Sequence, residues 1–357
     1  MGSTKIEWAD AVWNPIRGCS RVSEGCRNCY AERMAARHLP GHDSPWDGEA
    51  YAHMTESGAR WTGKVELIED KIMEPLTWRK PQRVFVNSMS DLFHERVTNE
   101  WVDRIFAVMA LARKHTFMVL TKRAGRMRRY SAPEAAARDR IEEEVRALTN
   151  CDWRFPLEAW PLPNVWMGVS VEDQRAVEER VPELLATPAA LRFVSCEPLL
   201  GPVDLYTWLP MLEIERESRC PDDAYLDWVI VGGESGPGAR PMHPEWARSI
   251  RDQCSAARVP FFFKQWGEWL PEDQFGTDGD KPTAAKTGAR WGILDRAGNY
   301  FAETTAWNGR TGKASEFGEV YMYHVGRRNA WRMMDGRIWE EVPTPALRLR
   351  RHTNGSL

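Results

Sequence analysis

Residues 165–186 of this 357-residue chain read VWMGVSVEDQRAVEERVPELLA. The first six residues form an apolar run rich in valine, which indicates a buried strand. From Glu172 to Ala186 the apolar residues then recur at helical spacing, which indicates an amphipathic helix. The stretch therefore predicts a βα unit, in which a buried strand leads into a helix that covers the sheet.

The same pattern recurs toward both ends of the chain. Further apolar runs lie near Ala11 to Pro15 and at residues 84–87, 116–121, 191–195, 228–233 and 260–264. Two more amphipathic segments extend from Glu100 to Lys114 and from Pro244 to Arg258. Six or seven βα units result, and a full or partial TIM-like (β/α) barrel accounts for them better than an open two-sided sheet.

The pattern changes near residue 270. We expect residues 1–270 to form the barrel, with a helical insertion near residues 129–163 that is rich in Ala, Arg and Glu. Residues 271–357 read as a loop followed by a small C-terminal β-rich appendage and a basic tail.

Composition narrows the class of protein. The formal charge of −3 is too small to indicate a nucleic-acid binder by itself, so such binding would depend on local patches. No apolar run reaches the length of a membrane span, and the N-terminus lacks a secretory signal, so we expect a cytoplasmic protein.

Seven cysteines in a reducing compartment favour metal or redox chemistry for a tight cluster. Four scattered ones read as small buried apolar residues: Cys151, Cys196, Cys220 and Cys254.

The other three cysteines lie together in residues 18–32, GCSRVSEGCRNCYAE. Cys19, Cys26 and Cys29 offer three thiolates, which are ligands that select zinc, copper(I) or iron–sulfur clusters. An iron–sulfur cube held by three cysteines keeps one iron open for a small molecule, which points to an enzyme. The alternative is zinc, with His38 completing a Cys3His set.

Polar residues follow the expected strands at their carboxyl ends. In a parallel barrel these ends share one mouth, where active sites form. Helix capping is the simpler explanation for Asp91 or Ser235 taken singly, and a solvated helix face is the simpler one for the basic run that begins at Lys122. Because that run follows a strand end, phosphate binding is an alternative. The polar ends are Asn87–Asp91, Thr121–Arg123, Ser170–Glu172, Ser195–Pro198, Gly232–Gly236 and Lys264–Trp266.

A cysteine loop after the first strand, closed by Cys-x-x-Cys-aromatic, resembles the radical S-adenosylmethionine (SAM) superfamily. The spacing here is C-x6-C-x2-C, whereas that superfamily usually has C-x3-C-x2-C. More of the chain resembles an uncharacterised phage and prophage family that is described as radical-SAM-like and associated with a three-Cys-motif partner protein. The matching motifs are residues 5–8 (KIEW), 13–15 (WNP), the cysteine loop, 231–236 (VGGESG), 263–267 (FKQWG) and 335–339 (DGRIW).

The resemblance implies a [4Fe-4S] cluster on Cys19, Cys26 and Cys29, with SAM on the fourth iron and cleavage of SAM to a 5'-deoxyadenosyl radical by a reductant. Tyr30 would lie near the adenine. The SAM amino group would meet the end of the second strand, at Asn87, Ser88, Ser90 and Asp91. Ribose hydroxyls would meet Ser170, Glu172, Ser195 and Glu197. Gly232, Gly233 and Glu234 look like the glycine motif of the superfamily on a later strand and would contact SAM or substrate. Independently of the resemblance, the basic residues at the strand ends are candidates to bind substrate phosphates: Lys122, Arg123 and Lys264.

Two classes of function follow from these patterns. The first is a radical-SAM-like enzyme that modifies or repairs a nucleobase, nucleotide or nucleic acid. The second is a zinc- or cluster-stabilised nucleic-acid-binding protein, in which the cysteines only staple the N-terminus. The polar strand ends favour the enzyme. The composition also argues against the binding protein, because a nucleic-acid-binding protein would show a stronger basic surface.

Overall fold

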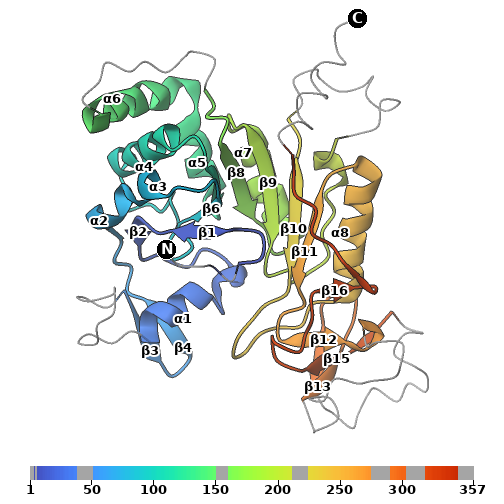
Figure 1. The fold of residues 1–357 in the computed structure, drawn as a ribbon. Helices are drawn as coiled ribbons and strands as arrows, with labels where there is room; N and C mark the ends of the chain where they lie inside the picture. The colour runs from blue at the N-terminus through green and yellow to red at the C-terminus, as the bar shows by residue number, and fades with distance from the viewer. Residues whose placement is uncertain are drawn as a thin grey trace, which may run out of the picture. The chain divides into compact units, whose positions relative to one another are not determined.

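The computed structural model describes residues 4, 6–37, 51–149, 160–210, 224–274, 290–302 and 318–344. The chain divides into two compact units, the first made of Met1–Ser195 with Ser235–Ala239 and the second of Cys196–Glu234 with Arg240–Leu357. Seven parallel strands alternate with helices along the chain (Figure 1), as the βα pattern predicts. The protein is thus a mixed α/β protein whose parallel strands are compatible with a partial TIM-like barrel. The predicted domain boundary at residue 270 stays a prediction.

The first unit contains a parallel sheet in the order β1-β6-β7-β8-β9. Its strands are β1 (Ala11–Trp13), β6 (Arg83–Val86), β7 (Thr116–Thr121), β8 (Val165–Ser170) and β9 (Leu191–Cys196). Every residue of β8 and β9 is buried, which is why these strands read as continuous apolar runs. Gly168 is paired with Phe193, and a Cβ at Gly168 would lie 2.4 Å from that ring. The glycine therefore makes room for an aromatic side chain inside the core.

Two helices of the first unit, α4 and α7, begin directly after a residue whose side chain caps the first turn. Thr98 accepts from the Trp101 amide before α4, and Asp173 accepts from the Ala176 amide before α7. Helix α4 contacts α6, and α5 contacts α7. The helical insertion expected near residues 129–163 contains α6, while residues 150–159 lie outside the described part. The helices are α1 (Tyr30–Arg37), α2 (Glu69–Ile72), α3 (Glu74–Thr77), α4 (Asn99–Leu111), α5 (Ala124–Ser131), α6 (Ala137–Thr149), α7 (Gln174–Leu185) and the short η1 (Glu24–Cys26) and η2 (Pro133–Ala135).

A small antiparallel layer beside α1 adds to the expected βα series. The hairpin of β3 (Ala52–Thr55) and β4 (Gly58–Trp61) contacts α1, as Figure 1 shows. Its buried residues form a separate small core with Ala35, Ala36 and Tyr51. The pair β2 (Ile16–Arg17) and β5 (Glu66–Leu67) fixes the chain on the N-terminal side of the cysteine loop.

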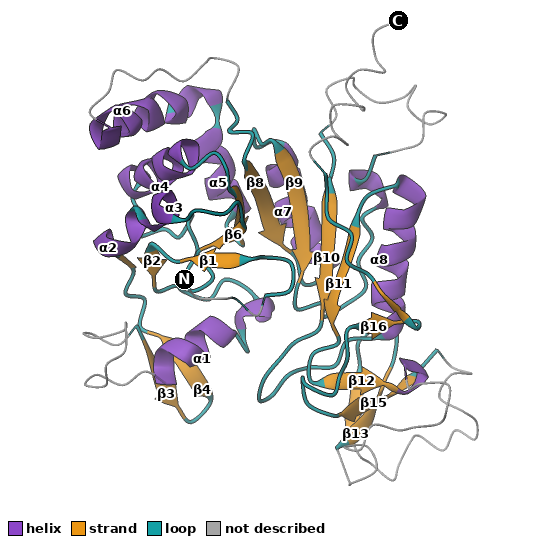
Figure 2. Cartoon of the chain, viewed as in Figure 1, coloured by secondary structure: helices purple, strands orange, loops and turns teal. Residues whose placement is uncertain are grey.

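The second unit contains the parallel pair β10 (Trp228–Gly232) and β11 (Phe261–Gln265), with α8 (Pro244–Ala257) in contact with both (Figure 2). The predicted β-rich appendage is confirmed as an antiparallel sheet in the order β12-β15-β13-β14. Its strands are β12 (Trp269–Pro271), β13 (Trp291–Leu294), β14 (Tyr300–Ala302) and β15 (Val320–His324), and the unit also has β16 (Met333–Met334), β17 (Arg337–Ile338), η4 (Tyr206–Trp208) and η6 (Glu272–Gln274).

Two sequence expectations meet the structure here. Within the described residues, no helix is both long enough and apolar enough to cross a bilayer. Cys196 and Cys254 are buried, as expected for cysteines that serve as small apolar residues, whereas Cys151, Cys220 and the basic tail lie outside the described part.

Candidate functional site

The cysteine loop joins β2 to α1 and follows the first parallel strand, as predicted. It leaves β2 at Gly18, which forms a parallel bridge with Ser90. Gly18 has a φ of +86°, and a Cβ there would lie 1.9 Å from the Lys64 carbonyl oxygen. Only glycine fits this position, so the entry to the loop is fixed by backbone contacts before any ligand is considered.

The three thiols of the loop are free and half-buried. Burial raises the pKa of Cys19 to about 12, the Asp91 carboxylate adds to the rise, and Arg123 opposes it. Burial also raises the pKa of Cys29, whose sulfur accepts from the backbone amides of Glu32 and Ala31 in the first turn of α1. A charge on Cys29 raises the pKa of Cys19, and one on Cys26 raises that of Cys29. Cys29 therefore lies within electrostatic reach of both Cys19 and Cys26.

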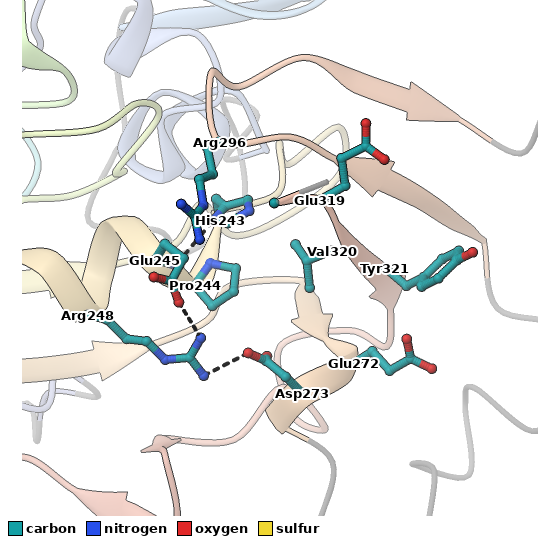
Figure 3. A pocket seen from close by; sticks show the side chains of 11 residues that line it. His243, Pro244, Glu245, Arg248, Glu272, Asp273, Arg296, Glu319, Val320 and Tyr321 are labelled. Carbon is teal, nitrogen blue, oxygen red and sulfur yellow. Dashed lines mark hydrogen bonds and ion pairs between the residues drawn. The ribbon is translucent and has the colours of Figure 1, made fainter. Parts of the chain in front are cut away.

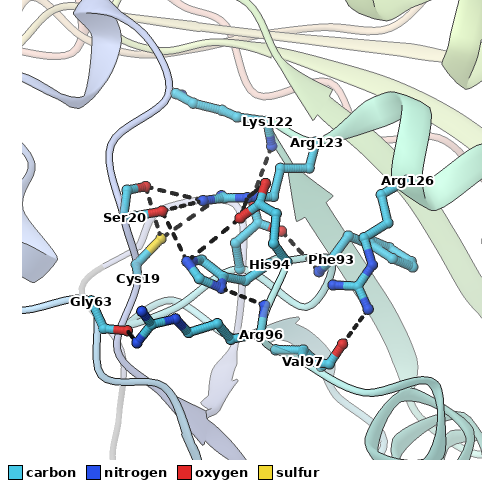
Figure 4. A network of polar contacts seen from close by, with 12 residues as sticks. Cys19, Ser20, Gly63, Phe93, His94, Arg96, Val97, Lys122, Arg123 and Arg126 are labelled. Carbon is cyan, nitrogen blue, oxygen red and sulfur yellow. Dashed lines mark hydrogen bonds and ion pairs between the residues drawn. The ribbon is translucent and has the colours of Figure 1, made fainter.

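Arg123 connects the loop to two strand ends (Figure 4). Its Nη1 lies 3.0 Å from Asp91 Oδ2 and 3.9 Å from Cys19 Sγ, and its Nη2 lies 2.9 Å from Ser20 Oγ and 3.2 Å from the Ser20 carbonyl oxygen. Its Nε donates to the Glu95 carboxylate at 2.9 Å. All five guanidinium hydrogens thus have acceptors within the protein. This use of Arg123 differs from the predicted contact with substrate phosphate.

His94 is a functional candidate that the sequence did not indicate. It is buried, its Nδ1 accepts from the Arg96 amide at 3.1 Å, and its Nε2 lies 2.9 Å from Ser20 Oγ. Since Nδ1 is an acceptor, the ring proton is on Nε2 and is donated to Ser20. Burial lowers the pKa of His94 and Arg123 lowers it further, so the ring is neutral near pH 7. No sequence pattern around His94 indicates its contact with Ser20, which lies 74 positions earlier in the chain.

The segment after β6 supports the loop from one side. Asp91 Oδ1 accepts from the Phe93 amide and the Thr121 hydroxyl, and Oδ2 accepts from the Lys122 amide and Arg123. With four donors, this carboxylate organises the protein and has no oxygen without a partner. Ser90 Oγ donates to the Ile16 carbonyl, which also ties the segment to the loop entry.

Asn87 and Ser88 begin the same segment. Asn87 has a φ of +62°, is 3% exposed and accepts from the Ile16 amide through Oδ1 at 3.3 Å. Its Nδ2 is buried without an acceptor among the described residues, which is uncommon for a buried amide. Ser88 donates to Asn14, and its carbonyl accepts from the Tyr30 hydroxyl at 2.8 Å. Tyr30 itself is 46% exposed beside the loop.

A second buried carboxylate supports the middle of the loop. Glu172, 2% exposed, forms an ion pair with Arg180 at 2.9 Å and accepts from Ser23. A Cβ on Gly25 would lie 3.1 Å from this carboxylate, so the loop passes close over it. Burial would raise the pKa of Glu172, but Lys122 and Arg180 outweigh burial and hold the pKa below its usual value. Ser170 and Ser195 are buried and face each other in the register of β8 and β9.

The pH dependence of the free energy of unfolding should report the ion pair between Glu172 and Arg180. Because the pKa of folded Glu172 is lowered, its contribution is present above the ordinary glutamate pKa of about 4.3 and is lost as the pH falls through the lowered value. We expect Glu172→Gln to cost about 1.5–3 kcal/mol at pH 7. Denaturant unfolding at pH 7, 5, 4 and 3 should show the gap to wild type closing below about pH 4. A gap that stays constant down to pH 3 would contradict this assignment; exposed Glu69→Gln, which faces Arg104, is the control.

A third buried carboxylate, missed by the sequence analysis, lies in α1. Glu32 is 1% exposed and accepts from Arg21 of the loop, with Arg21 Nε 2.9 Å from Oε2. It also accepts from the Trp61 amide of β4 at 2.8 Å. The start of α1 and a loop residue before it are tied to residues 235–239, because Arg33 donates to the Ser235 carbonyl and Asn28 donates to the Gly238 carbonyl. Buried carboxylates therefore support the cysteine loop at three places along its length.

The remaining predicted residues lie in the second unit and form ion pairs there. Lys264 Nζ lies 2.9 Å from Glu197 Oε1, and a Cβ on Gly232 would lie 2.5 Å from the same oxygen. Gly233 donates to the Gln265 carbonyl, and a Cβ on it would lie 2.0 Å from the Trp266 carbonyl oxygen. Glu234 is buried and pairs with Arg240 at 2.6 Å. The two glycines are thus required by close packing of backbone and side chain.

The second unit also has a pocket of about 520 Å³ at the N-terminus of α8, shown in Figure 3. Arg248 lies at its wall and pairs with Glu245 at 2.7 Å and with Asp273 at 2.7 Å. No residue predicted from the sequence lines this pocket.

The donor set of the cysteine loop, three thiols with an arginine beside Cys19, is of the kind that holds a zinc ion or an iron–sulfur cluster. A tetrahedral zinc with Zn–S bonds of about 2.3 Å would require sulfur atoms about 3.8 Å apart. Within the described residues, no three His, Cys, Asp or Glu side chains converge closely enough to hold one ion. A cube would bind the three thiolates at separate irons, and the amide donors to Cys29 and the cation beside Cys19 would suit such a cluster. His38, the alternative zinc ligand, lies outside the described residues.

The fold and the loop define an α/β protein with a three-cysteine site at the ends of parallel strands. The chain belongs to the family described as a protein of unknown function (DUF5131), whose model matches residues 3–343. Neither the curated proteins nor the solved structures include a match to the chain.

Proposed function

We propose that this protein is a radical-SAM-like iron–sulfur enzyme, built on a partial TIM-like barrel, that modifies or repairs a nucleobase, a nucleotide or a nucleic acid. The observation that carries the proposal is the support of the cysteine loop. Arg21, Ser20 and Ser23 of the loop are held by networks centred on Glu32, Asp91 and Glu172. These contacts hold the loop through side chains other than its thiols, which supports a role for the thiols as ligands of a reactive centre.

The contacts that hold the loop argue against a purely structural role for a metal bound by the cysteines. Small proteins that use zinc as a staple lack a preformed site, so the free energy of metal binding is also their free energy of folding. Here Arg21 of the loop pairs with buried Glu32, two buried ion pairs outside the loop lie against it, and the sheet that follows has a large apolar core. A zinc- or cluster-stabilised nucleic-acid-binding protein is thus the less favoured alternative.

Cys19, Cys26 and Cys29 would hold a [4Fe-4S] cluster. When bound, the cluster would supply an electron to SAM at its open iron, which is the chemistry that produces a 5'-deoxyadenosyl radical. Tyr30, which is exposed, would lie near the adenine, and the free Nδ2 of Asn87 offers a donor to a carboxylate or hydroxyl. The buried carboxylates then serve to orient the loop and exclude water around it.

The nucleic-acid part of the proposal comes from the basic residues and from the phage and prophage resemblance. Lys122 lies near Glu172 and Cys29, so this cation beside the loop would meet a phosphate. Lys264, in the second unit, is proposed separately as a phosphate contact. The three-Cys-motif partner protein named by the resemblance is our proposed partner, and a reductant is required.

The proposed activity can be tested by incubating anaerobically reconstituted protein with SAM and dithionite. We expect 5'-deoxyadenosine and methionine in equal amounts, because one electron from dithionite would cleave SAM to methionine and a 5'-deoxyadenosyl radical, which takes a hydrogen atom from a substrate or the buffer. Cys26→Ser should abolish the product, while Cys254→Ser, at a buried cysteine of the second unit, should retain it. A reconstituted wild-type protein that leaves SAM intact would contradict the proposed activity.

A further inference from the structure

The guanidinium of Arg123 is a buried cation placed against one of the three cysteine sulfurs. Its side chain is 6% exposed, and its Nη1 lies 3.9 Å from Cys19 Sγ. Salt and water therefore screen this charge from the sulfur far less than they would on the surface. The Cys19 thiol itself donates to the Ser20 carbonyl at 3.5 Å, and Arg123 is a charged donor to its sulfur.

The surrounding groups fix the position of the guanidinium. Asp91 and Glu95 hold it from the side of the sheet, while Ser20 holds its Nη2 from the loop. The neutral His94 ring donates to the same Ser20 hydroxyl, so it orients this contact without adding a second positive charge. The position of Arg123 is thus specified by three direct partners, one of which is oriented by His94, and the contact with Cys19 follows from them.

We infer that Arg123 is a positioning residue that sets the reduction potential of the metal centre through Cys19; this inference rests on the proposed function. Reduction of a cluster adds one negative charge, and a nearby cation stabilises the reduced form. Net charge and hydrogen bonds to the ligating sulfurs are among the main determinants of cluster potential. Arg123 therefore favours the reduced state, from which an electron can pass to a bound molecule.

The sign of the effect can be tested from both directions. Arg123→Met removes the cation and should lower the ratio of reduced to oxidised cluster at a fixed potential about tenfold, which equals about 59 mV for a one-electron couple. Glu95→Gln removes a carboxylate that offsets Arg123 and should raise the ratio. The second effect should be smaller, because Glu95 is 64% exposed and solvent screens its charge. Arg123→Lys keeps the positive charge but loses the planar set of guanidinium donors. Its ratio of reduced to oxidised cluster should therefore lie between those of wild type and Arg123→Met.

The measurement is a dithionite titration of the reconstituted protein, with the reduced cluster counted by electron paramagnetic resonance and iron and sulfide assayed in each sample. Arg140→Met, which breaks an ion pair with buried Asp103 on other helices, is the matched control and should leave the potential unchanged. If Arg123→Met does not fold, Glu95→Gln decides the sign alone, since its exposed side chain tolerates replacement.

The outcomes separate this inference from the proposed function. Loaded variants of Arg123 and Glu95 with the wild-type potential would overturn the role of Arg123 and leave the iron–sulfur enzyme standing. A wild-type protein that binds no iron and sulfide would overturn both. Shifts of opposite sign in Arg123→Met and Glu95→Gln would support the inference, because a merely structural role for Arg123 would not give them.

Discussion

Replacing Asp91 with alanine should lower the free energy of unfolding by about 3–5 kcal/mol, because the buried Arg123 would then lose its buried counter-charge. Asp91 is 6% exposed and accepts four hydrogen bonds, two of them from the backbone of Phe93 and Lys122. Its removal would leave those amides without partners as well. Urea denaturation followed by circular dichroism measures the loss.

Asp10→Ala is the control for the Asp91 substitution. Asp10 also pairs with an arginine, Arg83, but its side chain is 45% exposed. An exposed pair contributes only about 0–1 kcal/mol, so this variant should unfold close to wild type. Equal losses for Asp91→Ala and Asp10→Ala would show that the network around the cysteine loop contributes no more than a surface ion pair.

The second large effect is expected from Gly18→Ala. The φ of Gly18 is +86°, and the new Cβ would lie 1.9 Å from the Lys64 carbonyl oxygen, a backbone atom that cannot move without shifting its segment. Strained backbone alone costs about 1–3 kcal/mol. With the clash added, we expect a loss of at least about 4 kcal/mol, together with impaired metal loading, because Gly18 is the entry to the cysteine loop.

Gly58→Ala separates the clash from the strain in this second test. Gly58 has a similar φ of +99°, but a Cβ there would meet nothing within 4 Å. It should therefore show only the cost of strain, about 1–3 kcal/mol, and unchanged metal loading. Thermal denaturation and iron analysis of both variants provide the comparison, and a loss at Gly18 no greater than that at Gly58 would contradict the close approach.

The fold was largely predictable because buried parallel strands have a simple sequence signature. The runs at 116–121 and 165–170 coincide with β7 and β8, since both consist of apolar residues that meet other side chains on each face. Helices α7 and α8 begin within two residues of their predicted starts, because Asp173 and His243–Pro244 provide N-terminal caps. The β3–β4 hairpin was missed, because its strands are short and carry exposed polar residues.

The site was predictable in outline and not in detail. The strand-end rule indicated Asp91, Arg123 and Glu172, and the structure brings them to the cysteine loop. The strand-end rule could not show that Asp91 and Arg123 form an ion pair with each other. That pairing depends on a side-chain contact between residues more than 30 positions apart in the sequence. Glu32 and His94 had no local signal at all. Glu32 reads as an ordinary helix residue until β4 covers it.

The central claim is that the three cysteines hold an iron–sulfur cluster on a loop that is formed without it. Iron, sulfide and zinc counted per chain after anaerobic reconstitution test this claim most directly, for wild type, for Cys19→Ala, Cys26→Ala and Cys29→Ala, and for the buried Cys254→Ala. We predict about four irons and four sulfides in wild type and Cys254→Ala, their loss in the three loop variants, and cooperative unfolding in all five proteins. One zinc per chain without sulfide, and loop variants that fail to fold, would contradict the account and identify the cysteines as a structural staple.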